Sequence, residues 1–137
     1  MEKIKFGIIG AGHIGKRHAE MVLRNTNCEL TAICDVLPKE SLALEPYDVP
    51  YYNDYLKMLN SHQEIDVVCV CTPNGSHSDI SISVLKHDKH VVIEKPIGLT
   101  VANCEKVIFN ALQRNSLLYT SPSPRDATLG RMPSSAW

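Results

Sequence analysis

Residues 4–15 read IKFGIIGAGHIG, and this stretch decides the fold that the sequence predicts. Its first six residues are mostly apolar, which is typical of a strand buried on both faces. Gly10, Gly12 and Gly15 follow with the spacing Gly-x-Gly-x-x-Gly, and an amphipathic helical pattern runs over residues 14–23. The stretch therefore predicts a buried strand, a tight glycine turn and a helix, in that order.

Each glycine in this spacing has a mechanical role. Gly10 allows the tight turn off the strand, Gly12 lets a pyrophosphate approach bare backbone, and Gly15 lets the helix pack closely against the strand. The first helical turn, which includes His13 and Ile14, presents N–H groups and a positive dipole end to phosphates. The pattern favours dinucleotide binding, and a plain strand-to-helix turn is the alternative.

A carboxylate follows the next β-rich run. Residues 29–34 (ELTAIC) are mostly apolar, and Asp35 comes directly after them, twenty residues beyond Gly15. An acceptor at this place bonds the ribose 2′-hydroxyl of NAD and repels the 2′-phosphate of NADP. No arginine follows that would hold a phosphate, and only Lys39 is near. We therefore expect NAD rather than NADP, with a cap on a turn or helix as the alternative role of Asp35.

Length and charge narrow the class of protein. The chain has 137 residues and a formal net charge of −1, with acids and bases interspersed. This length favours one domain, and the balanced charge gives no electrostatic footprint for nucleic acid or an anionic membrane. The first apolar run is too short for a signal peptide or a membrane span, so we expect a cytoplasmic protein.

The cysteines are odd in number and lie mostly in predicted strands and helices: Cys28, Cys34, Cys69, Cys71 and Cys104. Cys69 and Cys71 share one face of a strand, but no second pair with Cys or His spacing completes a zinc site. We expect buried thiols in a reducing compartment and no metal site.

The rest of the chain alternates β-rich and helical runs. Asn53 can cap one helix, with Tyr55, Leu56 and Leu59 on its inner face. The expected strands are at residues 50–52, 65–71 and 90–93, and the expected helices are at 39–44, from 53, at 77–87 and at 100–115. This alternation predicts right-handed crossovers and an α/β fold with a doubly wound parallel sheet.

Two loops follow predicted strands at the carboxyl edge of this sheet. Residues 72–75 (TPNG) follow the strand at 65–71, and residues 94–96 (EKP) follow the next strand. Proline stops strand pairing, and ligands bind outside this edge in open α/β sheets. Lys95 can place its ammonium near a bound ring or a substrate hydroxyl, or can pair with Glu94 as a solvated loop residue.

Four blocks in this order carry a resemblance to a known family: GIIGAGHIGKRHAEM, the acid at Asp35, VVCVCTPNGSH and KHVVIEKPIGLT. From Lys3 to about Asn115 the chain resembles the NAD-binding Rossmann domain of the Gfo/Idh/MocA oxidoreductases. The resemblance implies reversible oxidation of a sugar, sugar-nucleotide or cyclitol hydroxyl, with hydride passing to NAD or, less favourably, NADP. Overall similarity leans towards members acting on nucleotide-linked sugars. The family's oligomerisation is expected only of a full-length protein.

The resemblance also assigns roles to residues. Lys95 is the candidate catalytic residue, which orients the substrate and lowers the pKa of its hydroxyl. The candidate cofactor-binding residues are Gly10, Gly12, His13, Ile14, Gly15, Asp35, Thr72, Pro73, Asn74, His77, Glu94, Lys95 and Pro96. A non-catalytic redox-sensing module that binds a dinucleotide, or a methyltransferase, is the alternative, although neither requires the Glu-Lys-Pro segment.

Two features depart from the family pattern. Where relatives usually have a glycine before the Lys-His-Val strand, this chain has Asp88, which we expect in the left-handed cap conformation. The family's second domain, an α+β sheet with substrate contacts, should begin near residue 120, and the sequence does not contain it.

The last residues have a composition and a resemblance of their own. Residues 117–126, LLYTSPSPRD, are similar to the translation of a tagmentation sequencing adapter, and residues 131–136 match its far end. A native linker rich in Ser and Pro is the alternative. Sparse apolar groups cannot offset an ordering cost of ~1 to 2 kcal/mol per residue. We expect one domain over 1–116 and a disordered, non-native tail over 117–137, of which at most Leu117 and Leu118 continue the preceding element.

Overall fold

Residues 3–72, 77–94, 101–113 and 118–121 are described by the structure, which is a computed structural model. The chain divides into two units, Met1–Thr72 and Pro73–Trp137. Among the described residues, no helix is long and apolar enough to cross a membrane.

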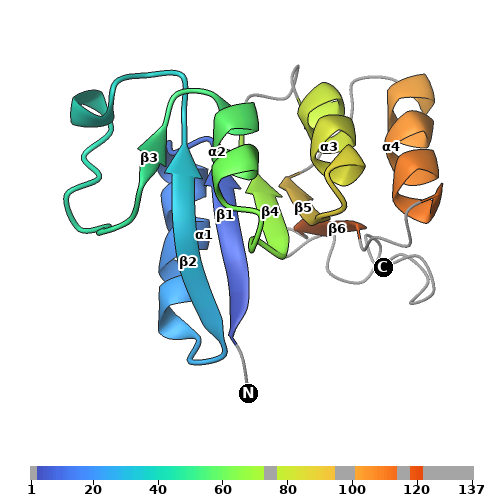
Figure 1. Cartoon of the computed structure of the whole chain (residues 1–137). Coiled ribbons are helices and arrows are strands. Elements are labelled where there is room, and N and C mark those ends of the chain that lie inside the picture. The colour runs from blue at the N-terminus through green and yellow to red at the C-terminus, as the bar shows by residue number, and fades with distance from the viewer. Residues whose placement is uncertain (1–2, 73–76, 95–100, 114–117, 122–137) are drawn as a thin grey trace. The chain divides into compact units, whose positions relative to one another are not determined.

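The first unit is built on a parallel sheet (Figure 1). Its described strands are β1 (Ile4–Ile9), β2 (Cys28–Cys34), β3 (Tyr51–Tyr52) and β4 (Val67–Val70). Strand β1 pairs with β2 and with β4, and β2 pairs with β3, so the order is β3-β2-β1-β4. The predicted strands at 50–52 and 65–71 are confirmed in somewhat shorter form, and β1 lies inside the sheet as its apolar sequence requires.

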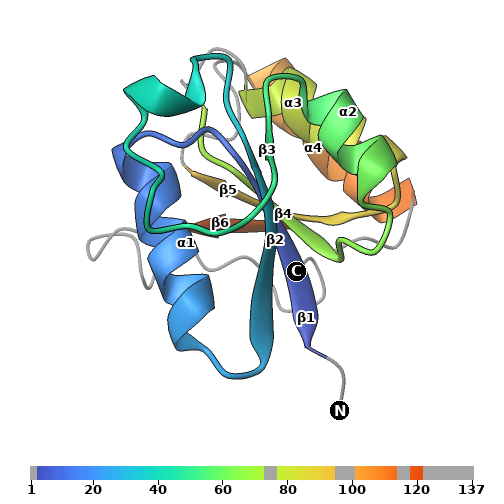
Figure 2. The same ribbon diagram turned by 60° about the vertical axis from the view of Figure 1, so that its left-hand side comes forward.

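Helices cover both faces of this sheet. Helix α1 (His13–Arg24) lies on one face and α2 (Tyr55–Ser61) on the other (Figure 2). The fully buried side chains of the unit include Ile8, Met58, Leu59, Ile65, Val68 and Val70. Parallel neighbours joined through helices on opposite faces are the arrangement of a doubly wound sheet.

The start of α2 differs from the expectation. Asp54, not Asn53, is the N-cap, because its side chain accepts a hydrogen bond from the Leu56 N–H (3.0 Å). The N-cap therefore lies one residue later than expected, and the helix itself begins at Tyr55. Met58 and Leu59 are buried, whereas Leu56 is 40% exposed.

The helix expected at 39–44 is shorter than the sequence suggested. It is a single 3-10 turn, η1 (Lys39–Ser41). Ala43 has a φ of 51°, in the left-handed region, so a right-handed helix cannot continue through it. Leu42 and Leu44 on either side are buried, and their burial fixes this bend.

The second unit contains α3 (His77–Lys86), β5 (His90–Glu94), α4 (Val101–Gln113) and β6 (Leu118–Ser121). Helix α3 packs against β5 and lies beside α4 (Figure 1). Val84 and Leu85 on α3 and Val107 on α4 are fully buried. The expected helices and the strand after Lys89 are confirmed.

Residues 118–121 correct the predicted domain boundary. The sequence predicts a tail from residue 117, but residues 118–121 form β6, which pairs parallel with β5 from Val91↔Leu118 to Glu94↔Ser121. Leu118, Tyr119 and Thr120 suit a strand once a partner edge is present, which composition alone does not reveal. Residues 122–137 lie outside the described residues, so disorder and foreign origin there stay predictions.

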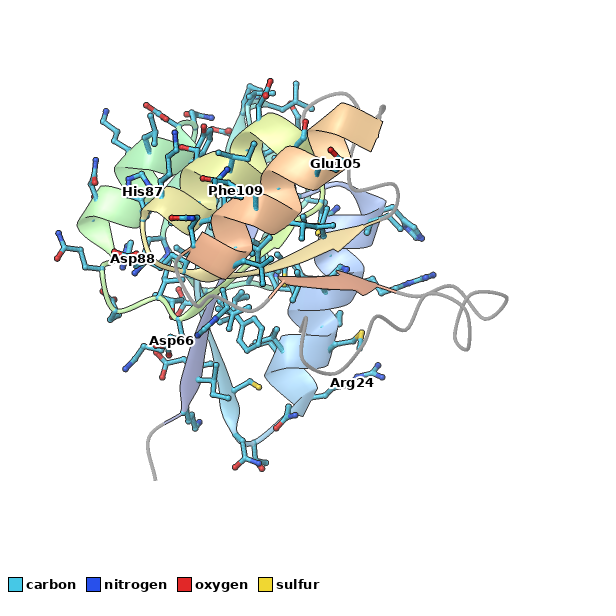
Figure 3. The ribbon with its side chains drawn as sticks, turned by 90° about the vertical axis from the view of Figure 1, so that its right-hand side faces the viewer. Arg24, Asp66, His87, Asp88, Glu105 and Phe109 are labelled. Atoms are coloured by element: carbon cyan, nitrogen blue, oxygen red, sulfur yellow. The ribbon has the colours of Figure 1, made fainter. Side chains whose placement is uncertain are left out.

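The turn after α3 confirms one expectation (Figure 3). Asp88 has a φ of 62°, the left-handed conformation expected where relatives have glycine. The His87 N–H donates to the Val84 carbonyl (3.0 Å), and the Asp88 N–H donates to the Leu85 carbonyl (2.9 Å). These bonds satisfy carbonyl groups at the end of the helix.

Candidate functional site

The glycine turn after β1 has no room for side chains at two of its three glycines. Gly10 has a φ of 98°, and a Cβ built there would lie 2.7 Å from both the carbonyl carbon and the oxygen of Cys71. A Cβ on Gly15 would lie 1.8 Å from the Gly10 carbonyl oxygen. These contacts are with backbone, which cannot move aside as a flexible side chain can. The tight turn and the close helix packing expected of Gly10 and Gly15 are therefore present.

Gly12 has the opposite environment. No described atom apart from its chain neighbours and the helix backbone lies within 4 Å of its ideal Cβ position. Gly12 is the N-cap of α1, and the first turn of this helix contains no acidic residue. His13 and Ile14 are exposed residues of the first helical turn. Their N–H groups have no intrahelical acceptor at this end of the helix. Bare backbone and a positive helix end together suit an anion.

The Asp35 carboxylate lies against this turn. Its Oδ2 accepts a hydrogen bond from the Ala11 N–H (2.7 Å), and its Oδ1 accepts one from the Leu37 N–H (3.0 Å). The second bond makes Asp35 a cap of its own turn, which is the alternative role that the sequence predicts for it. The first bond places the carboxylate beside the glycines. A carboxylate offers about four acceptor positions, so both oxygens keep capacity for a further donor.

Two residues that the sequence did not indicate hold the turn at residues 35–37. The Tyr51 hydroxyl donates to the carbonyl oxygen of Asp35 (3.1 Å) and contacts that of Leu37. The Asn53 amide Nδ2 lies 3.2 Å from each of the same two oxygens. The carboxyl ends of neighbouring parallel strands meet at one edge of a sheet. The place of Tyr51 and Asn53 at the end of β3, beside the end of β2, could therefore have indicated this contact.

Burial and charge keep two groups of this region protonated. Burial raises the pKa of the Cys34 thiol to about 12, and the charges of Asp35 and Asp54 add to the effect. Burial also raises the pKa of Tyr51 to about 12, with Asp35, Cys34 and Glu40 adding to it. At neutral pH Cys34 is therefore a thiol rather than a nucleophilic thiolate. Tyr51 keeps the proton that it donates to the turn.

The other cysteines fit the expectation only in part. Cys34 and Cys69 are buried, whereas Cys28 and Cys71 are half-buried, and the side chain of Cys104 lies outside the described residues. Within the described part of the chain, no group of three His, Cys, Asp or Glu side chains could hold a metal ion.

The remaining candidate residues are only partly described. Thr72 is half-buried, and its backbone nitrogen would lie 2.9 Å from a Cβ on Gly10, so it adjoins the glycine turn. His77 begins α3 and Glu94 ends β5, but their side chains lie outside the described residues. Pro73, Asn74, Lys95 and Pro96 also lie outside them. The structure thus brings together the glycines, the start of α1, Asp35 and Thr72.

One cavity of the first unit, about 500 Å³ in volume, lies away from these residues. It opens at the amino ends of β1 and β2, where Lys3, Cys28 and Tyr47 are among its lining residues. None of the candidate site residues lines it.

Comparison with known proteins identifies the family. A family model described as an oxidoreductase family with an NAD-binding Rossmann fold matches residues 4–121, which include parts of both units. Inositol 2-dehydrogenase of Salmonella paratyphi B is 34% identical over 116 residues, which cover 82% of this chain and 34% of that protein. Myo-inositol 2-dehydrogenase of Thermotoga maritima is 32% identical over 123 residues, which cover 85% of this chain and 35% of that protein.

Solved structures give the same result for the fold. The WlbA dehydrogenase from Bordetella pertussis, in complex with NADH and UDP-GlcNAcA, matches with a TM-score of 0.82 at 25% identity, over 93% of this chain and 39% of that one. The expected α/β fold with a doubly wound parallel sheet is confirmed. The chain spans about a third of the length of the curated relatives it matches. On the match over residues 4–121, this chain belongs to the Gfo/Idh/MocA oxidoreductase family, of which it contains the NAD-binding Rossmann fold.

Proposed function

We propose that this chain binds NAD as the cofactor-binding part of an oxidoreductase that transfers hydride between nicotinamide and a cyclitol or sugar hydroxyl. The observation that carries the proposal is that the Asp35 carboxylate is bonded to the residue next to Gly12. Open space lies over Gly12, and the carboxylate is hydrogen-bonded to the N–H of the adjacent Ala11. The N–H that holds the candidate ribose acceptor thus belongs to the residue next to the candidate phosphate-binding backbone.

The residues present fit this cofactor. The pyrophosphate would lie over Gly12 at the positive end of α1, where a side chain would block its approach. The ribose 2′-hydroxyl would donate to Asp35, whose two bonds to N–H groups hold it in place. Val36 and Leu37, 85% and 50% exposed, follow it. Neither is a cation that would attract a 2′-phosphate, which supports NAD over NADP.

The chemistry proposed for the hydroxyl rests on Lys95. Bound NAD supplies the hydride acceptor. Lys95 follows Glu94, the last residue of β5, and ligands bind beyond the carboxyl ends of strands in this fold. Its ammonium would orient the substrate hydroxyl and lower the pKa of that group. A cyclitol is favoured over a nucleotide-linked sugar, because the two inositol dehydrogenases are 34% and 32% identical and the WlbA dehydrogenase is 25% identical.

Titration of the whole chain with NADH and NADPH, followed by nucleotide fluorescence, tests the binding proposal. We expect NADH to bind at least about tenfold more tightly, a difference of about 1.4 kcal/mol. Asp35→Ser should erode this preference. Gly12→Val should abolish NADH binding while the far-UV circular dichroism spectrum stays native. Equal affinity for both nucleotides would contradict the role of Asp35, and absence of NADH binding would contradict the function.

We expect binding without turnover. General acid–base catalysis needs a positioned proton acceptor and typically contributes ~10² to 10⁴-fold, and Lys95, as an ammonium, is a poor base. Incubation of the chain with NAD⁺ and myo-inositol should therefore give no rise in NADH absorbance. Turnover at a rate usual for dehydrogenases would show that Lys95 and the rest of this chain suffice.

A further inference from the structure

We propose that Tyr51 and Asn53 are positioning residues of the nucleotide site, which hold the turn at residues 35–37 so that the Asp35 carboxylate faces the glycine turn and the ribose. This inference rests on the proposed NAD-binding function and deepens it. It concerns two side chains that hydrogen-bond to the backbone carbonyl oxygens of Asp35 and Leu37.

Donors and acceptors match at this turn. The Asn53 amide carries two N–H protons, and its nitrogen lies 3.2 Å from both carbonyl oxygens, so it can donate to each. The Tyr51 hydroxyl has one proton, which it shares between the same two oxygens. Three protons therefore serve two carbonyl groups that can accept four. Both side chains thus connect the turn to β3 and to the residue that follows it.

The turn has few other attachments. Strand β3 has only two residues, and the Asp35 N–H donates to the Tyr52 carbonyl (3.1 Å) at the end of its pairing with β2. Val36 is 85% exposed and Leu37 is 50% exposed, so packing contributes little to the order of Val36 and only part of that of Leu37. At the carbonyl groups of Asp35 and Leu37, side-chain hydrogen bonds from Tyr51 and Asn53 hold the turn in place of backbone pairing.

The shape of the turn sets the direction of the carboxylate. Asp35 receives one bond from within the turn, from Leu37, and one from the glycine turn, at Ala11. Both distances depend on the main chain at residues 35–37. If the turn loosens, the acceptor for the 2′-hydroxyl of NADH is lost. Repulsion of the 2′-phosphate of NADPH relaxes at the same time, so the preference between the two nucleotides falls.

The test uses the whole chain with Tyr51→Phe, Asn53→Ala and the double variant, titrated with NADH and NADPH. The matched control is Tyr52→Phe, because the Tyr52 hydroxyl bonds to His62 Nε2 (2.8 Å) rather than to the turn. Loss of one hydrogen bond typically corresponds to about threefold to tenfold in an equilibrium constant. We expect the NADH preference to fall by about this factor in each single variant, and by less than about twofold in Tyr52→Phe.

A measurement without nucleotide separates this inference from the proposed function. Amide hydrogen exchange at Ala11 and Leu37 reports the two bonds to Asp35. Exchange at both should become faster in Tyr51→Phe and Asn53→Ala and stay unchanged in Tyr52→Phe. If the unmodified chain does not bind NADH, the proposed function fails, whatever the exchange rates.

Two results would overturn the positioning role while the proposed function stands. The first is a double variant that keeps both the nucleotide preference and the protection of Ala11. The second is an equal loss of preference in Tyr52→Phe, which would indicate a general effect of β3 rather than a specific one.

Discussion

Replacing each glycine of the turn by alanine should separate the glycines that the fold needs from the one that the ligand needs. Gly10 and Gly15 face backbone at distances that no Cβ can occupy, whereas Gly12 faces open space. The three substitutions add the same methyl group within six residues. Any difference between them therefore reports the local geometry rather than the chemistry of the change.

The magnitudes follow from these contacts. At Gly15 the methyl group would lie 1.8 Å from a backbone oxygen, so α1 must shift, and we expect a loss of about 3 kcal/mol or more, at the upper end of overpacking costs. At Gly10 the positive φ alone costs roughly 1 to 3 kcal/mol, and the contact with Cys71 adds to it. At Gly12 the φ is −76° with open space. Alanine there should change stability by less than about 1 kcal/mol, because the gain from a less flexible unfolded chain opposes the preference for glycine over alanine at an N-cap.

Thermal unfolding followed by circular dichroism measures the first effect. At roughly 4 °C per kcal/mol for a domain of this size, Gly10→Ala and Gly15→Ala should each lower Tm by about 10 °C or more. Gly12→Ala should leave Tm within a few degrees and weaken NADH binding about tenfold or more, because its methyl group stands where the pyrophosphate approaches. A Gly12→Ala protein that melts as early as Gly15→Ala, or a Gly15→Ala protein with unchanged Tm, would refute the reasoning.

Three further predictions follow from single features. Asp88→Gly should raise the free energy of unfolding in urea by up to about 1 kcal/mol, since a left-handed L-residue is strained; a loss would mean that the Asp88 side chain contributes more than this strain costs. A chain ending at Ser121 should keep its Tm, whereas one ending at residue 117 should melt earlier because it lacks β6; equal Tm values would show that β6 adds no stability. The pKa of Glu64 lies below its usual 4.5 because of a backbone hydrogen bond and the neighbouring His62. Its contribution to stability is therefore present above pH 4.5 and lost as pH falls through the folded pKa. In Glu64→Gln, the free energy of unfolding measured in urea should fall less steeply as the pH drops below 4.5. An unchanged fall would contradict this.

The sequence was sufficient to predict those features of the fold that have a local physical cause. A β-rich apolar run followed by Gly10, Gly12 and Gly15 leaves few conformations that bury the run and turn sharply. The turn and the helix packing therefore follow from spacing alone. The left-handed φ of Asp88 is equally local, because a helix that stops just before a strand needs a residue that tolerates this conformation.

Sequence reasoning failed where two local rules compete. Asn53 and Asp54 are both good N-caps, and only the fold decides between them. Asp54 caps α2, which leaves the Asn53 amide for the turn at residues 35–37. Its partners lie 16 and 18 positions away in the chain, and Tyr51 reaches the same two carbonyls. No periodicity relates such residues, because parallel pairing of β2 with β3 is what brings them together.

Asp35 shows why the two interpretations of one carboxylate need not exclude each other. As a turn cap it accepts from Leu37, and as a candidate ribose acceptor it lies beside the glycine turn through Ala11. Each bond uses one of the acceptor positions on a different oxygen, and a carboxylate has about four. The cap therefore fixes the direction of the side chain before any nucleotide arrives. Binding of a ligand then has to offset a smaller loss of side-chain conformational entropy, which is the physical advantage of a preorganised site.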